Sequence, residues 1–102
     1  MDYVEQIRDI IVSEVKPDKI ILFGSRARGD NCEDSDYDIL VLKSQFIDRR
    51  KALKDLRVSL YKKGVCVAMD ILFLDTAKYV ELSGVNGLVY TDIKKDGRVI
   101  YG

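Results

Sequence analysis

The chain has 102 residues, of which 47% are hydrophobic and 33% are charged, so we expect residues 1–102 to form one ordered domain with a single modest core. Seventeen basic side chains balance seventeen acidic ones, and this zero net charge argues against nucleic acid and anionic membranes as partners. No apolar run approaches the roughly 20 residues that span a bilayer, and the start lacks a signal-peptide pattern, which favours a cytoplasmic protein.

The first half of the chain alternates between helical and strand patterns. Apolar residues at helical spacing predict an amphipathic helix over residues 2–15, with Asp2 as its N-cap. The apolar run 19–23 predicts a buried strand, followed by a Gly-Ser turn and a short helical segment. A polar loop over 29–35 then leads into a second strand over 36–42.

The second half continues this alternation. Residues 47–62 predict a surface helix, and the apolar run 65–74 predicts a long buried strand. A helix over about 76–89 is weakened by its internal glycines, and a turn at Asp96-Gly97 predicts a short final strand. The order α-β-α-β-α-β-α-β predicts an α/β fold, with helices packed on a mixed sheet of about four strands.

The segment 47–63 is strongly basic. It carries seven lysines and arginines against Asp48 and Asp55. We interpret this pattern as a solvated helix face, and the alternative is a docking surface for an acceptor or partner.

Two residue types limit the chemistry. The chain contains no histidine, which excludes Ser-His-Asp and Cys-His catalysis as well as metal-bound imidazole. Cys32 and Cys66 make neither a disulfide framework nor a zinc site, and Cys66 lies in an apolar run, which predicts a core residue. Any metal must be held by oxygen atoms, which favours Mg²⁺ or Mn²⁺.

The most informative pattern is Gly24-Ser25 followed by Asp36-Tyr37-Asp38. A strand that runs through Gly-Ser into a helix start can cradle phosphate, because free backbone N–H groups and the helix dipole point at the anion. Asp36 and Asp38 share one face of the predicted strand about 6.6 Å apart, so both carboxylates reach one cation site. Each motif alone is equally typical of a plain turn or a polar strand start. Together they predict a metal–nucleotide site.

Asp70 lies in the middle of the predicted strand 65–74. A buried carboxylate must pair with a cation, take up a proton or bind metal. If this strand lies beside the strand 36–42, Asp70 approaches Asp36 and Asp38, and a divalent ion relieves their repulsion. The alternative is an ion pair with a lysine or arginine. Asp75 is the rival third carboxylate, although a helix N-cap role suits its place at the strand end.

Arg26 and Arg28 flank the predicted phosphate site. Such a pair is commonly solvated, but either guanidinium is suited to phosphate oxygens. We favour Arg26 because it follows Ser25 directly.

These motifs resemble the signature of the DNA polymerase β-like nucleotidyltransferases. It stands here as Gly24-Ser25, then Asp36-Tyr37-Asp38, with a third aspartate at Asp70 on a later strand. The resemblance covers residues 4 to 75, and the small size is similar to the minimal nucleotidyltransferases (MNT proteins) of that superfamily.

The resemblance implies a Mg²⁺-dependent enzyme that uses ATP. Gly24, Ser25 and Arg26 would bind the nucleotide triphosphate, and Asp36, Asp38 and Asp70 would hold two Mg²⁺ ions. Asp70 would also help deprotonate the acceptor hydroxyl, which attacks the α-phosphate and releases pyrophosphate.

The resemblance also implies a partner. Minimal nucleotidyltransferases are typically paired with a small helical HEPN toxin, and the MNT member acts as an antitoxin by transferring AMP to a tyrosine of that toxin. The alternatives are an antitoxin that neutralises its partner by binding alone, and a nucleotidyltransferase acting on a small molecule or an RNA end. The sequence leaves the nucleotide base, the modified residue and the oligomeric state open.

Overall fold

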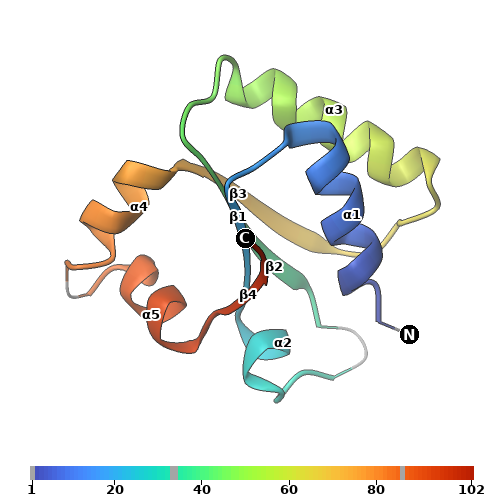
Figure 1. Ribbon diagram of the computed structural model, residues 1–102. Coiled ribbons are helices and arrows are strands. Elements are labelled where there is room, and N and C mark those ends of the chain that lie inside the picture. The colour runs from blue at the N-terminus through green and yellow to red at the C-terminus, as the bar shows by residue number, and fades with distance from the viewer. Residues whose placement is uncertain (1, 33–34, 86) are drawn as a thin grey trace.

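Strands and helices follow one another along the chain in the computed structural model, which describes residues 2–32, 35–85 and 87–102. The elements are α1 (Val4–Val15), β1 (Lys19–Phe23), α2 (Ser25–Arg28), β2 (Tyr37–Lys43), α3 (Arg49–Lys62), β3 (Met69–Asp75), α4 (Thr76–Leu82), α5 (Val89–Asp96) and β4 (Arg98–Tyr101) (Figure 1). In the described part of the chain, no helix has the length and apolar composition needed to cross a bilayer.

The strands form one mixed sheet of four strands, as the sequence predicts, and their order is β3-β2-β1-β4. β1 pairs antiparallel with β2 and β4, whereas β2 pairs parallel with β3. The end of β1 therefore lies at the same end of the sheet as the starts of β2 and β3. Phe23 is opposite Asp38 on one side, and Asp38 is opposite Asp70 on the other.

Helices cover both faces of the sheet (Figure 1). Because strand side chains alternate between faces, Ile39 and Val41 of β2 join a core with α1 and α3, while Leu40 and Leu42 join a second core with α5. Asp38 shares the face of Leu40. The acidic residues thus lie at the open end of the α4–α5 face of the sheet.

Two helix starts follow from local hydrogen bonding. Asp48 is the N-cap of α3, and its carboxylate accepts a hydrogen bond from the Lys51 N–H at 3.1 Å. At α1 the N-cap position is Tyr3 rather than the predicted Asp2. The Asp2 carboxylate nevertheless accepts a hydrogen bond from the Val4 N–H at 2.9 Å, so it still satisfies an N–H group of the first turn.

The prediction of one helix over 76–89 is wrong. α4 ends at Leu82, and a turn through Ser83-Gly84 and Gly87 separates it from α5. Gly87 has φ +89°, a conformation that interrupts a helix and that glycine adopts without strain. The chain therefore carries an additional helix, α5, before the predicted final strand.

The long strand predicted over 65–74 is also shorter than expected. β3 starts at Met69 because its partner β2 starts at Tyr37, directly opposite. Asp70 is therefore the second residue of the strand and is exposed, so the prediction of a buried carboxylate at this position is wrong. Cys66 precedes the strand and is exposed rather than in the core, while Val65 is buried.

Candidate active site

Asp38 lies between the Gly24 turn and Asp70, because β2 is the strand that separates β1 from β3. Its register partners are Phe23, which directly precedes Gly24, and Asp70. Asp36 lies two residues before Asp38 along the same segment. The pairing therefore brings together four of the residues that the sequence singled out: Gly24, Asp36, Asp38 and Asp70.

Gly24 is required at this turn for two reasons. Its φ of +74° lies in the left-handed region, where side chains are strained. A Cβ atom at this position would also collide with a carboxylate oxygen of Asp38 and lie 3.1 Å from its Cγ atom. The Asp38 carboxylate thus occupies the space that the absent side chain leaves open.

The turn continues directly into α2, which has a single turn. The Gly24 carbonyl accepts hydrogen bonds from the N–H groups of Ala27 at 3.1 Å and Arg28 at 3.2 Å. The N–H groups of the first residues of a helix have no partner inside it, and Ser25 is the first helical residue. The Ser25 backbone N–H therefore belongs to a helix start directly after the glycine that adjoins Asp38, an arrangement suited to an anion.

Burial raises the pKa of the Asp38 carboxyl above its usual value, and the neighbouring charges of Asp70 and Asp36 raise it further. The guanidinium of Arg28 acts in the opposite direction and lowers this pKa. The charges of Asp70 and Asp36 are therefore close enough to Asp38 to disfavour its ionised form. A cation among them would remove that repulsion.

The donor set is chemically suited to a hard divalent ion, since all three side chains are carboxylates. None of the ion pairs found among residues 2–32, 35–85 and 87–102 involves Asp70, so the alternative of an ion pair for Asp70 finds no support there. Within the same described residues, no group of three or more Asp, Glu or Cys side chains is already gathered tightly enough to hold a metal ion.

Asp75, the rival third carboxylate, lies at the other end of β3. It is opposite Lys43 in the parallel register and forms an ion pair with Arg49 at 3.0 Å. It occupies the N-cap position of α4, as expected, but its side chain makes no capping hydrogen bond. Asp75 therefore lies outside the cluster formed by Asp36, Asp38 and Asp70.

The two arginines of α2 take different positions. Arg26 lies over the ring of Tyr37 at 3.9 Å and donates a hydrogen bond to the Ser35 carbonyl at 3.0 Å. Tyr37 belongs to the face opposite Asp36 and Asp38, so Arg26 fastens the loop before β2. That Arg26 contacts phosphate stays a prediction, and Arg28 is the arginine that faces the Asp38 side.

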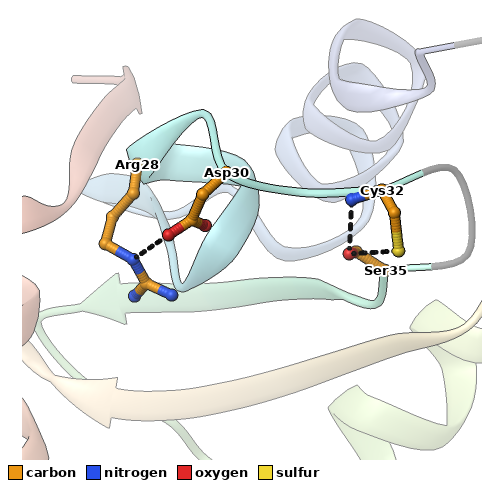
Figure 2. A network of polar contacts seen from close by, with 4 residues as sticks. All are labelled: Arg28, Asp30, Cys32 and Ser35. Atoms are coloured by element: carbon orange, nitrogen blue, oxygen red, sulfur yellow. Dashed lines mark hydrogen bonds and ion pairs between the residues drawn. The ribbon is translucent and has the colours of Figure 1, made fainter.

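The loop between α2 and β2 is joined by local polar contacts (Figure 2). Arg28 forms an ion pair with Asp30 at 3.2 Å, and the Cys32 N–H donates to the Ser35 hydroxyl at 3.0 Å. The Cys32 sulfur lies 3.5 Å from the same hydroxyl. These contacts support the segment that leads directly into Asp36.

Tyr37, the middle residue of the Asp-x-Asp motif, anchors the motif to the core. Its side chain is 1% exposed, and its hydroxyl accepts a hydrogen bond from the Tyr3 N–H at 3.0 Å. The ring of Tyr3 meets the Tyr37 ring edge-on. Because Tyr37 is fixed in this way, its neighbours Asp36 and Asp38 are directed to the opposite face of the strand.

A cleft of about 260 Å³ opens beside Asp38, between α2 and α5. The sequence did not predict the contribution of α5, because the helix predicted over 76–89 ended at the residue where α5 begins. The spacing of Asp92 and Asp96 around Ile93 is the signal that could have revealed this wall, since it puts two carboxylates beside an apolar residue on one helix face. We call it the α2–α5 cleft, and its lining residues are Phe23, Gly24, Arg28, Asp38, Asp92, Ile93 and Asp96.

A larger hollow of about 340 Å³ lies elsewhere, between the end of α1 and the start of α3. Its lining includes Lys43, the last residue of β2, and none of the motif residues. Of the predicted site residues, Gly24 and Asp38 line the smaller cleft at the opposite end of the strand, which makes it part of the candidate active site.

Known proteins are similar to this chain along most of its length. The family described as polymerase beta, nucleotidyltransferase matches residues 5–102. A relative from Methanocaldococcus jannaschii that is named a protein adenylyltransferase is 33% identical over 64 residues. The matched region covers 58% of this chain, and the chain spans 65% of the length of that relative.

Solved structures share the fold. A toxin–antitoxin crystal structure with AMP-PNP gives a TM-score of 0.68 at 22% identity, covering 96% of this chain and 72% of the other. A variant of the MntA–HpeT toxin–antitoxin gives 0.69 at 21% identity, covering 100% and 74%. The family match, the shared fold and the Gly24-Ser25 and Asp36-x-Asp38 geometry agree: the chain belongs to the polymerase β nucleotidyltransferase family.

Proposed function

We propose that this chain transfers AMP from ATP to a hydroxyl group of a partner protein, and that the partner is a HEPN toxin modified on a tyrosine. The observation that carries the proposal is the register that sets Asp38 between the Gly24 turn and Asp70. A relative named a protein adenylyltransferase supports the reaction type. The fold shared with toxin–antitoxin proteins supports an antitoxin role.

The residues of the cluster divide into two groups. Gly24 and Ser25 bind the phosphates of ATP through the turn at the start of α2. Asp36, Asp38 and Asp70 would hold Mg²⁺, which supplies charge stabilisation for the attacking and leaving oxygens. Oxygen donors alone make up this set, in keeping with the preference of Mg²⁺.

The transfer itself is a single displacement at phosphorus. The acceptor hydroxyl oxygen forms a bond to the α-phosphorus, and the bond from that phosphorus to the bridging oxygen of the β-phosphate breaks. Pyrophosphate leaves with the electron pair, and the hydroxyl proton passes to a carboxylate, for which Asp70 is our candidate. Asp70 is exposed at the edge of the sheet, where a protein acceptor can reach it.

Of the two arginines, Arg28 is the better candidate for charge neutralisation on the phosphates. It lines the α2–α5 cleft together with Gly24 and Asp38, whereas Arg26 is engaged with Tyr37 and Ser35. Arg26 would then contribute by supporting the loop before β2.

The test is transfer of label from α-³²P-ATP with Mg²⁺ to proteins that co-purify with the chain. The Asp36→Ala/Asp38→Ala variant is the test variant, and Asp9→Ala/Asp55→Ala removes two exposed carboxylates elsewhere as the matched control. We expect the partner to be labelled by the wild type and the control but not by the test variant. Equal labelling by the test variant contradicts the proposal.

A second candidate is an antitoxin that neutralises its toxin by binding alone. It is favoured by one observation: solved structures that share the fold are toxin–antitoxin assemblies. Neutralisation of the toxin by the Asp36→Ala/Asp38→Ala variant, measured as growth during co-expression, would establish this second candidate.

A further inference from the structure

The wall that α5 contributes to the α2–α5 cleft has no part in the displacement described above. Asp92 and Asp96 are one helical turn apart, which separates them by about 6 Å along the helix axis. Both are exposed, while Ile93 between them is 2% exposed and packs into the sheet core. Phe23, which is half-buried and directly precedes Gly24, is the other apolar side chain that lines the cleft.

The charges of this cleft decide which part of a nucleotide it can accept. The seven lining residues include three carboxylates, those of Asp38, Asp92 and Asp96. Arg28 is the one cation among them, and it also forms an ion pair with Asp30. A triphosphate placed along α5 would be repelled by two carboxylates. The phosphates therefore belong at the Gly24-Ser25 end, and the uncharged nucleoside is the part that α5 tolerates.

The cleft also has the size and the polarity of a nucleoside site. Its volume of about 260 Å³ is slightly smaller than that of a pocket for a whole small molecule, which suits one part of a nucleotide, and Phe23 gives it an apolar surface for a flat base. Carboxylates accept hydrogen bonds but cannot donate them when ionised, so the complementary ligand carries hydroxyl or amino donors. The two ribose hydroxyls are such donors on the portion of ATP that adjoins the α-phosphate.

We propose that the α2–α5 cleft binds the nucleoside of the incoming nucleotide, with the base against Phe23 and the ribose hydroxyls donating to Asp92 and Asp96. The assignment rests on the proposed function for the position of the phosphates. It makes α5 the element that selects ribonucleotides over nucleotides lacking the 2′- and 3′-hydroxyls.

Titration calorimetry with purified protein, Mg²⁺ and four nucleotides tests this assignment: ATP, 2′-deoxy-ATP, 3′-deoxy-ATP and 2′,3′-dideoxy-ATP. The wild type is expected to bind ATP about tenfold more tightly than dideoxy-ATP, because hydrogen bonds to charged groups are then lost. Asp92→Ala and Asp96→Ala each remove one acceptor, so each is expected to weaken ATP binding about threefold while leaving dideoxy-ATP binding nearly unchanged. Lys95→Gln on the same helix, outside the cleft, is the matched control.

Equal binding of ATP and dideoxy-ATP by the wild type overturns the assignment. This comparison needs no variant, so the assignment can be tested even if the variants fail to fold. Ala variants that bind ATP like the wild type also overturn it. Loss of Mn²⁺ binding by these variants without nucleotide, measured by electron paramagnetic resonance, would mark the cleft as a cation site instead.

These outcomes separate the two proposals. A wild-type chain that binds ATP with the expected hydroxyl preference but labels no partner retains the nucleoside site and loses the proposed transfer. A chain that labels its partner with no preference for ribose hydroxyls retains the transfer and loses the nucleoside site. A chain that binds no nucleotide at all overturns both.

Discussion

Asp38 is subject to three constraints at once. Its carboxylate fills the space over Gly24, it is opposite Asp70 across the parallel pair, and it is partly withdrawn from water. Each of these disfavours its negative charge in the absence of a cation. A carboxylate whose charge is disfavoured lowers the free energy of unfolding of the protein. Such a loss of stability is common at active sites.

Replacement of Asp38 by Asn should therefore stabilise the metal-free protein at neutral pH. Because the folded-state pKa of Asp38 is raised, the native state binds a proton to higher pH than the unfolded chain does. Stability falls as pH rises through the interval between the two pKa values, and it stays lower at neutral pH. Thermal unfolding in EDTA should show this fall for the wild type and not for Asp38→Asn, which should also lose transfer at least about a hundredfold.

A lower melting temperature of Asp38→Asn at pH 7 in EDTA would contradict this account. Addition of Mg²⁺ provides the internal control, since it should raise the melting temperature of the wild type more than that of the variant.

Replacement of Gly24 by Ala should damage both stability and activity, and Gly29→Ala separates the two effects. Both glycines have positive φ, +74° and +84°, so each alanine should destabilise the fold by about 1–2 kcal/mol. Only at Gly24 does the new methyl group meet Asp38, because no atom lies within 4 Å of a Cβ at Gly29. Chemical unfolding should therefore report a larger loss from Gly24→Ala, where the collision adds to the backbone strain, and only Gly24→Ala should lower transfer, by about a hundredfold. Full activity of Gly24→Ala would mean that Asp38 moves without consequence.

At the scale of the element, α2 has two arginines that serve different surfaces. Arg26 is directed to Tyr37 and the loop before β2, while Arg28 lines the cleft beside Asp38. Two residues apart on a helical turn, the two side chains cannot face the same way. One short helix thus both supports the Asp-x-Asp motif and contributes a charge to the cleft.

The two arginines should respond differently to replacement by Gln. Arg26→Gln removes the contact with the Tyr37 ring and should destabilise the protein by about 1–2 kcal/mol. Arg28→Gln should change stability little, because its ion pair with Asp30 is exposed, but it should raise KM for ATP several-fold. Urea unfolding and steady-state kinetics measure the two effects, and the reverse pattern would assign the phosphate contact to Arg26.

Elements with a strong local signal could be predicted from the sequence. The apolar run 19–23, the Gly-Ser turn and the Asp-x-Asp strand lie where their residues indicate. The start of β3 could not be predicted, because it is set by the start of its partner β2 rather than by the apolar run that precedes Met69. The division between α4 and α5 depends on the glycine conformation at Gly87, which sequence pattern alone does not determine.

The candidate site divides in the same way. Gly24, Asp36, Asp38 and Asp70 follow from motif spacing, and the register brings them together as expected. The α5 side of the cleft is formed by a helix distant in sequence and without a motif of its own, so tertiary packing alone reveals it.

At the scale of the whole molecule, β2 joins the two cores. Ile39 is 1% exposed and packs with α1 and α3, while its neighbour Leu40 is 0% exposed and packs with α5 on the other face. Both cores therefore depend on a single strand, and we expect the domain to unfold as one cooperative unit.

Ile39→Ala and Leu40→Ala test this unity. Each should destabilise the protein by about 2–5 kcal/mol, because each leaves a cavity in a packed interior. Guanidinium unfolding followed by tyrosine fluorescence and by circular dichroism should give coincident single transitions for both variants. Separate transitions for the two probes would show that the two faces of the sheet unfold independently.

The contact between Tyr3 and Tyr37 has a mechanical consequence. A pull on the chain ahead of α1 reaches the middle of the Asp-x-Asp motif through one hydrogen bond and one ring contact. The segment ahead of α1 is thus coupled to the positions of Asp36 and Asp38. Tension or crowding at this segment would shift the two carboxylates. A carrier protein or surface attached ahead of Tyr3 should therefore be joined through a slack Gly/Ser linker.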